Sequence, residues 1–266
     1  MADTTSALYV YCIVSSTRQP SVARVPAGLS GASRTDVHPL VGSLWLVSAE
    51  VPLDIYAPAN LEPRLRDLDW VSSAAVAHEA VIEHFSRARG AVVVPTKLFT
   101  MFSSLERALE ETARRRRAIE CAMRHIAGCE EWGVRIARRP AAAVSRRSSR
   151  PEARGRRPGA AFLEARKDAR DAAAAARADA FEAADEAFDR LRRRAKDAHR
   201  RDRRPEPGTN PPILEAAFLV PAAGRARFKA EAKRQARAVA GVGADLALTG
   251  PWPAYNFVGL ADEERA

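Results

Sequence analysis

The chain has 266 residues, of which 47% are hydrophobic and 29% charged, so its length and composition suit one large domain or two small ones around a buried core. No apolar run reaches the roughly 18 to 20 residues needed to span a bilayer, and the start lacks the basic residues of a secretory signal. Three cysteines (Cys12, Cys121 and Cys129) lack the paired spacing of a disulfide framework. We therefore expect a cytoplasmic protein without a membrane segment or disulfides.

The net charge of +10 is concentrated in one segment. Residues 138–204 contain 21 basic and 11 acidic residues, whereas the remaining chain contains 22 of each. The most basic stretch, residues 146–157, predicts salt-sensitive and nonspecific binding to nucleic acid as one possible role. It lacks the interleaved aromatic residues that stack on bases, so a solvated linker or a contact for an acidic protein remains the alternative.

The first half predicts a sheet covered by helices. Residues 7–14 are β-forming and apolar on both alternating faces, which indicates a strand covered on both sides. We expect further strands at 34–39, 44–49 and 91–94, with Pro95 ending the last of them, and a short helix at 61–68. Residues 70–89 have a helical apolar period, and Ser103 with Glu106 reads as a capping box for a helix to about residue 127.

The second half alternates strands and helices. A strand begins near residue 131, and residues 140–159 have the composition of a disordered linker. An Ala-rich helix then spans about 160–199, long enough to project beyond its domain or to pair with a partner helix. Strands at 213–220, 245–249 and 255–259 surround a helix at 222–240. The order β-α-β-α-β, with a possible last strand, fits helices packed on one face of a sheet.

Neither a catalytic set nor a cofactor motif is evident. His78 and His84 are six residues apart on one helix, which is the wrong spacing for two metal ligands, so His78 on the apolar stripe is expected to be a hydrogen-bonded core residue. Glu110 and Glu111 are spaced to pair with Arg114 and Arg115 on a solvated helix face. We therefore expect a protein that is not an enzyme and that holds no metal or cofactor.

Aromatic, proline and glycine residues gather near the end of the chain. Gly250 permits a backbone turn that a Cβ would hinder, and Pro251 and Pro253 keep the chain extended. This arrangement presents Trp252, Tyr255 and Phe257 as large apolar anchors. The rings either fill the core of the second domain or face a partner protein.

Several stretches, taken in order, resemble the GvpL/GvpF family of gas vesicle proteins. They are the strand 8–14, His78-Glu79-Ala80-Val81-Ile82-Glu83, the segment Val93-Val94-Pro95-Thr96-Lys97-Leu98-Phe99-Thr100-Met101-Phe102, Glu131-Trp132-Gly133-Val134-Arg135, and Leu248-Thr249-Gly250-Pro251-Trp252-Pro253-Ala254-Tyr255-Asn256-Phe257. Phe99 stands where many family members carry glycine, and the basic insert matches nothing in the family.

The resemblance implies an α+β fold with two domains, which we place at residues 1–128 and 129–266, the second being a modified ferredoxin-like domain. It also implies a role in assembling gas vesicles in the cytoplasm, by binding the small hydrophobic shell protein GvpA and other accessory proteins. Residues expected to shape the partner-binding or structural surfaces are Pro95, Lys97, Trp132, Gly250, Pro251, Trp252, Pro253, Tyr255 and Phe257.

Overall fold

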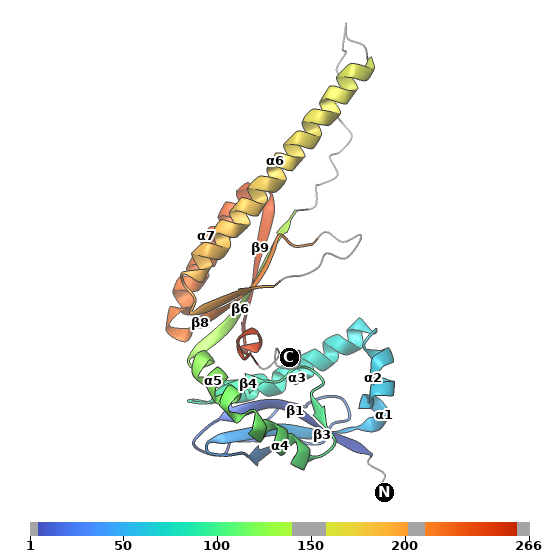
Figure 1. The fold of residues 1–266 in the computed structure, drawn as a ribbon, viewed down its shortest axis with the longest axis vertical. Helices are drawn as coiled ribbons and strands as arrows, with labels where there is room; N and C mark the ends of the chain where they lie inside the picture. Colours follow the sequence, from blue (N-terminus) through green and yellow to red (C-terminus); the bar gives the residue numbers. More distant parts are fainter. Residues whose placement is uncertain (1–4, 140–157, 202–210, 260–266) are drawn as a thin grey trace. The chain divides into compact units, whose positions relative to one another are not determined.

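The structure is a computed structural model that describes residues 5–139, 158–201 and 211–259. The chain divides into two compact units (Figure 1). Unit 1 contains the described residues up to 131 together with those from 251 onward, and unit 2 contains those between 132 and 250. Residues 251–259, which we assigned to the second domain, therefore belong to the first unit. None of the helices in the described ranges is both long and apolar enough to cross a membrane.

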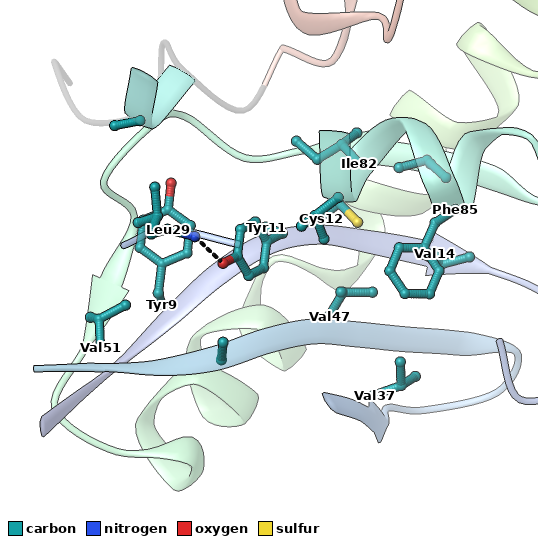
Figure 2. Packing of buried hydrophobic residues seen from close by; sticks show 14 of the residues in the cluster. Tyr9, Tyr11, Cys12, Val14, Leu29, Val37, Val47, Val51, Ile82 and Phe85 are labelled. Carbon is teal, nitrogen blue, oxygen red and sulfur yellow. Dashed lines mark hydrogen bonds between the residues drawn. The ribbon is translucent and has the colours of Figure 1, made fainter. Parts of the chain in front are cut away.

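Unit 1 contains an antiparallel sheet in the order β2-β3-β1-β4, with β5 also pairing with β1. Its strands are β1 (Ser6–Ser15), β2 (Asp36–Pro39), β3 (Leu44–Pro52), β4 (Val92–Pro95) and β5 (Met101–Phe102). Because β1 lies inside the sheet and is covered on both faces, seven consecutive residues from Leu8 to Val14 are buried. Figure 2 shows this core, in which side chains of β1 and β3 pack beneath Ile82 and Phe85.

The helices of unit 1 are α1 (Leu53–Tyr56), α2 (Pro58–Arg64), α3 (Leu68–Ser86), α4 (Leu105–Arg114) and α5 (Arg116–Ile126). The apolar stripe predicted for α3 is buried at Ala74, His78, Val81, Ile82 and Phe85. Two predictions were wrong in detail. The short helix begins at Pro58 and ends at Arg64, and the helix predicted from Ser103 is two helices that break at Arg115, with Ser104 as the N-cap that accepts from Arg107 N.

Unit 2 contains a four-stranded sheet in the order β7-β8-β6-β9. Its elements are β6 (Cys129–Arg138), α6 (Pro158–Arg192), β7 (Asp197–Arg200), β8 (Leu214–Pro221), a 3-10 turn η1 (Ala222–Gly224), α7 (Arg225–Gly241) and β9 (Ala244–Trp252). The chain order is thus β-α-β-β-α-β. The long helix ends at Arg192 rather than near 199, because the residues that follow pair with β8 as an edge strand.

The helix α6 packs only along its C-terminal part. Ala180, Ala184, Ala187 and Leu191 are buried against the sheet, whereas every side chain from 162 to 179 is exposed. Figure 1 shows that the N-terminal part of the helix extends well beyond its sheet, as the length of the Ala-rich segment predicted. The predicted linker was too long by two residues, since α6 begins at Pro158, and residues 140–157 lie outside the described residues.

Candidate partner-binding groove

A buried tyrosine–histidine pair fixes the segment that connects β4 to β5. His78 Nε2 donates to the carbonyl oxygen of Thr96 at 3.2 Å, so its Nδ1 is unprotonated and accepts from the Tyr9 hydroxyl at 2.8 Å. The Tyr9 oxygen in turn accepts from Phe99 N at 3.2 Å. Burial lowers the pKa of His78 to about 4, which keeps the ring neutral. His78 is therefore the hydrogen-bonded core residue that its place on the apolar stripe predicted.

The segment between β4 and β5 loops away from β1 and returns to it. Thr96 N donates to Tyr11 O at 3.1 Å, and Val10 N donates to Thr100 O at 3.0 Å, so both ends of the loop remain attached to β1. Phe99, at the tip, has a φ of 65°, a left-handed conformation that costs a non-glycine residue energy. Its ring stacks on Trp70 with centroids 5.6 Å apart and an interplanar angle of 10°. This contact holds Phe99 where many family members carry glycine.

The last described residues pack onto unit 1 through two carboxylates. The Tyr255 hydroxyl donates to Glu79 Oε2 of α3 at 2.6 Å. Asn256 N donates to Glu131 Oε2 at 2.9 Å, and its side-chain amide donates to the other oxygen of the same carboxylate. Burial raises the pKa of Glu79, and burial together with the bond to Glu79 raises the pKa of Tyr255. The C-terminal segment is thus a fixed part of unit 1.

These elements enclose a groove of about 610 Å³. One wall is the loop between β4 and β5, the other is α4, and the C-terminal segment contributes Tyr255 and Val258. The residues that line it are Pro95, Thr96, Lys97, Leu98, Phe99, Thr100, Met101, Phe102, Arg107, Glu110, Glu111, Arg114, Arg115, Tyr255 and Val258. Leu98, Phe99, Met101 and Phe102 are only partly buried, so the groove offers apolar surface to a partner.

The charges around the groove are unevenly paired. Arg107 forms an ion pair with Glu110 at 3.2 Å, while Glu111 is shared by Arg114 at 3.4 Å and Arg115 at 3.6 Å. Lys97 is exposed and forms no ion pair with any described residue. Four cations therefore face two carboxylates, and the groove carries excess positive charge. The predicted pairing with Arg114 and Arg115 is confirmed for Glu111, whereas Glu110 pairs with Arg107 instead. The part that α4 plays in a groove was not predicted.

The structure brings three of the predicted site residues together in this groove, namely Pro95, Lys97 and Tyr255. Pro251, Trp252 and Pro253 line a second, smaller hollow of about 230 Å³ in unit 1, where Trp252 is 45% exposed. Phe257 is buried, and it lies in the 3-10 turn η2 (Tyr255–Phe257) where we predicted a strand. The alternative that these rings fill the core of the second half was wrong for Tyr255, which packs against the core of unit 1.

Trp132 and Gly250 lie elsewhere. Trp132 is 4% exposed in the core of unit 2, where its ring packs against Phe228 and lies 5.7 Å from Lys229 Nζ. Gly250 adopts a positive φ of 117°, which favours glycine, but it lies within β9 and not in the turn that we predicted there. Trp132 is therefore a core residue of unit 2 and is not among the residues that line the groove.

Sequence reasoning did not assign Tyr9 or the three arginines of the groove to a site. Tyr9 was taken only as a strand residue, although its hydroxyl had to find a partner once buried. Arg107, Arg114 and Arg115 carry no signal of their own, because the same residue types would occupy any solvated helix face. No group of three or more potential metal ligands occurs within the described ranges. The basic stretch 146–157 lies outside the described residues, so nucleic-acid binding by it stays a hypothesis.

Comparison with known proteins shows the family of this chain. Residues 7–259 match the family model described as gas vesicle synthesis protein GvpL/GvpF. The chain belongs to the GvpL/GvpF family. It is 32% identical over 270 residues to gas vesicle protein L of Streptomyces sp. (strain CB03234), a match that covers 96% of this chain and 94% of the relative.

Solved structures of the family have the same fold. The gas vesicle protein GvpF of Anabaena sp. PCC7120 matches with a TM-score of 0.67 at 15% identity, over 96% of this chain and 97% of that one. GvpF of Microcystis aeruginosa matches with a TM-score of 0.61 at 14% identity, over 96% and 99% of the two chains. The family membership that the motifs suggested is confirmed, and it gives this GvpL/GvpF protein a role in gas vesicle assembly.

Proposed function

We propose that this protein is an accessory or minor structural component of gas vesicle assembly that binds the shell protein GvpA and other gas vesicle proteins. The observation that carries the proposal is the groove of unit 1. Its walls are built from the family-like segment 95–102 and from Tyr255, and they expose Leu98, Phe99 and Met101 beside unbalanced positive charge. A small hydrophobic shell protein would aggregate before assembly, and an open apolar groove can shield part of its surface.

We propose further that the protein is not an enzyme. The ionisable groups at the groove are mainly helix-surface ion pairs, and burial moves the pKa of His78 and Tyr9 away from neutral pH rather than toward it. We place its work in the cytoplasm, at the vesicle. We also infer two domains, with unit 2 a modified ferredoxin-like domain, which its β-α-β-β-α-β order and its sheet order β7-β8-β6-β9 support.

A binding experiment with two matched variants tests the proposal. Leu98→Glu puts a carboxylate into the groove, whereas Val76→Glu makes the same kind of change at an exposed apolar residue of α3 that does not line it. Purified GvpA, kept dispersed in mild detergent, is titrated onto the immobilised full chain. We expect Leu98→Glu to weaken binding at least about tenfold, because it replaces apolar surface that the partner would cover with a charged group that must lose its water on binding.

The control variant should bind as the unchanged protein does. Circular dichroism of both variants verifies that they fold. If GvpA and the other gas vesicle proteins fail to bind the unchanged chain, the proposed function is wrong. If they bind equally well to Leu98→Glu, the function stands but the groove is not where it resides.

A further inference from the structure

A trough, distinct from the groove of unit 1, lies on unit 2 between one flank of α7 and the adjoining face of β9. It measures about 400 Å³. Leu246 and Leu248 of β9 form an apolar floor, and both are only partly buried. The small side chains of Ala232 and Ala236 form the α7 wall. The helix α7 therefore leaves part of the apolar face of β9 uncovered.

The two flanks of α7 differ in how their charges are paired. Glu231 is buried, accepts hydrogen bonds from Arg234 and Gln235, and lies 3.9 Å from Arg194. These contacts lower the pKa of Glu231, the hydrogen bond from Arg234 being the largest cause. On the trough side, Lys229 and Lys233 are both exposed, and neither forms an ion pair with any described residue. Lys229 Nζ lies 5.7 Å from the centroid of the Trp132 ring, a contact that leaves its charge without a carboxylate partner among these residues.

The spacing of the lysines matches a second helix laid beside α7. Residues four apart on a helix lie on one side and about 6 Å apart along its axis. Ala232 is buried in the core of unit 2, but the small, partly exposed side chain of Ala236 allows another helix to approach closely. Ridges on one helix pack into grooves on the other at roughly 8 to 10 Å between axes. An extended strand at the edge of β9 would not use this arrangement, because the trough lies on the helix-bearing face of the sheet.

We propose that this trough is a docking site for an amphipathic acidic helix of a partner protein. The apolar stripe of that helix covers Leu246 and Leu248, and two of its carboxylates, four residues apart, pair with Lys229 and Lys233. The charge complementarity favours an acidic partner, and the apolar floor favours a protein over nucleic acid. This inference rests on the proposed function, because the partner is sought among gas vesicle proteins.

The test uses the full chain and each protein of its gas vesicle gene cluster, purified separately. Lys233→Glu reverses one charge in the trough, and Arg227→Glu reverses one exposed charge on the same helix outside it. We expect Lys233→Glu to weaken binding of at least one cluster protein about fivefold, and Arg227→Glu to change it less than about twofold. A photo-cross-linking benzoylphenylalanine in place of Ala236 then identifies the bound segment by mass spectrometry, with Ala238 as the control position.

A cross-linked segment that carries two carboxylates four residues apart in a helical apolar pattern would support the proposal. Cross-linking to a second copy of this chain, or to a segment without that pair, would overturn it. The docking proposal is also refuted if Leu98→Glu weakens binding of the partners but Lys233→Glu weakens it no more than Arg227→Glu does. In that case the proposed function stands. If no cluster protein binds the unchanged chain, the proposed function and this inference both fail.

Discussion

Phe99 offers a sharp test of how the groove loop is held. Its φ of 65° is left-handed, a conformation that costs a residue with a Cβ roughly 1–2 kcal/mol and costs glycine almost nothing. Phe99→Ala and Phe99→Gly both remove the ring from Trp70, so their difference isolates the backbone. Alanine normally stabilises a protein over glycine by about 0.4–1 kcal/mol through the unfolded chain. Here the strain outweighs that gain, and the glycine variant should be the more stable by about 1 kcal/mol.

The assay is equilibrium urea unfolding of the full chain with each variant. The neighbouring pair Leu98→Ala and Leu98→Gly is the control, since Leu98 is not among the described residues with positive φ. At that position the order should reverse, with alanine the more stable variant. An alanine variant at position 99 that is as stable as the glycine variant would refute the idea that the loop stores backbone strain.

Three further predictions concern the contacts around the groove. The pKa of His78 is lowered from 6.5 to about 4, so between these pH values the folded state binds fewer protons than the unfolded state. The contribution of His78 to the unfolding free energy should therefore be complete above pH 6.5 and should fall by about 3 kcal/mol as the pH drops to 4. Unfolding curves across this range check it, and His78→Asn should flatten the dependence. Tyr255→Phe removes the hydrogen bond to Glu79 and should lower the unfolding free energy by about 1–2 kcal/mol. Hydrogen exchange in this variant should speed up more at residues 251–258 than in α3. Equal protection of residues 251–258 in the variant and the unchanged protein would contradict the anchoring role. Ser104→Ala removes the N-cap of α4 and should cost about 1 kcal/mol in urea unfolding, whereas Ser103→Ala should cost little, and the opposite order would restore the capping box first predicted.

The sequence revealed those parts of the fold whose residues carry their own pattern. The strand β1 is apolar on both faces because it lies inside a covered sheet, and α3 keeps its apolar period because one face is buried. By contrast, β7 has four residues with two half-buried and two exposed, so nothing but its pairing with β8 defines it. The break at Arg115 was equally invisible, because good helix formers stand on both sides of it.

The groove could be predicted only in part, because contacts between residues far apart in the sequence build it. The segment 95–102 and Tyr255 were recognised through the family resemblance, and Pro95 was predicted to end a strand. That Tyr255 reaches Glu79 depends on a contact between residues 176 apart in the sequence, which no local pattern specifies. Tryptophan is a residue type common in interface anchors, yet Trp132 is buried in unit 2, since an aromatic ring packs equally well in a core.

The most direct test of the central claim is vesicle formation in cells that carry the complete gas vesicle gene cluster. The gene for this protein is replaced by the Leu98→Glu variant in one strain and by the Val76→Glu variant in another, and vesicles are counted by electron microscopy at matched protein levels. If the groove holds other gas vesicle proteins during assembly, the first strain should have few or misshapen vesicles and the second should have normal ones. Normal vesicles in both strains would contradict the account.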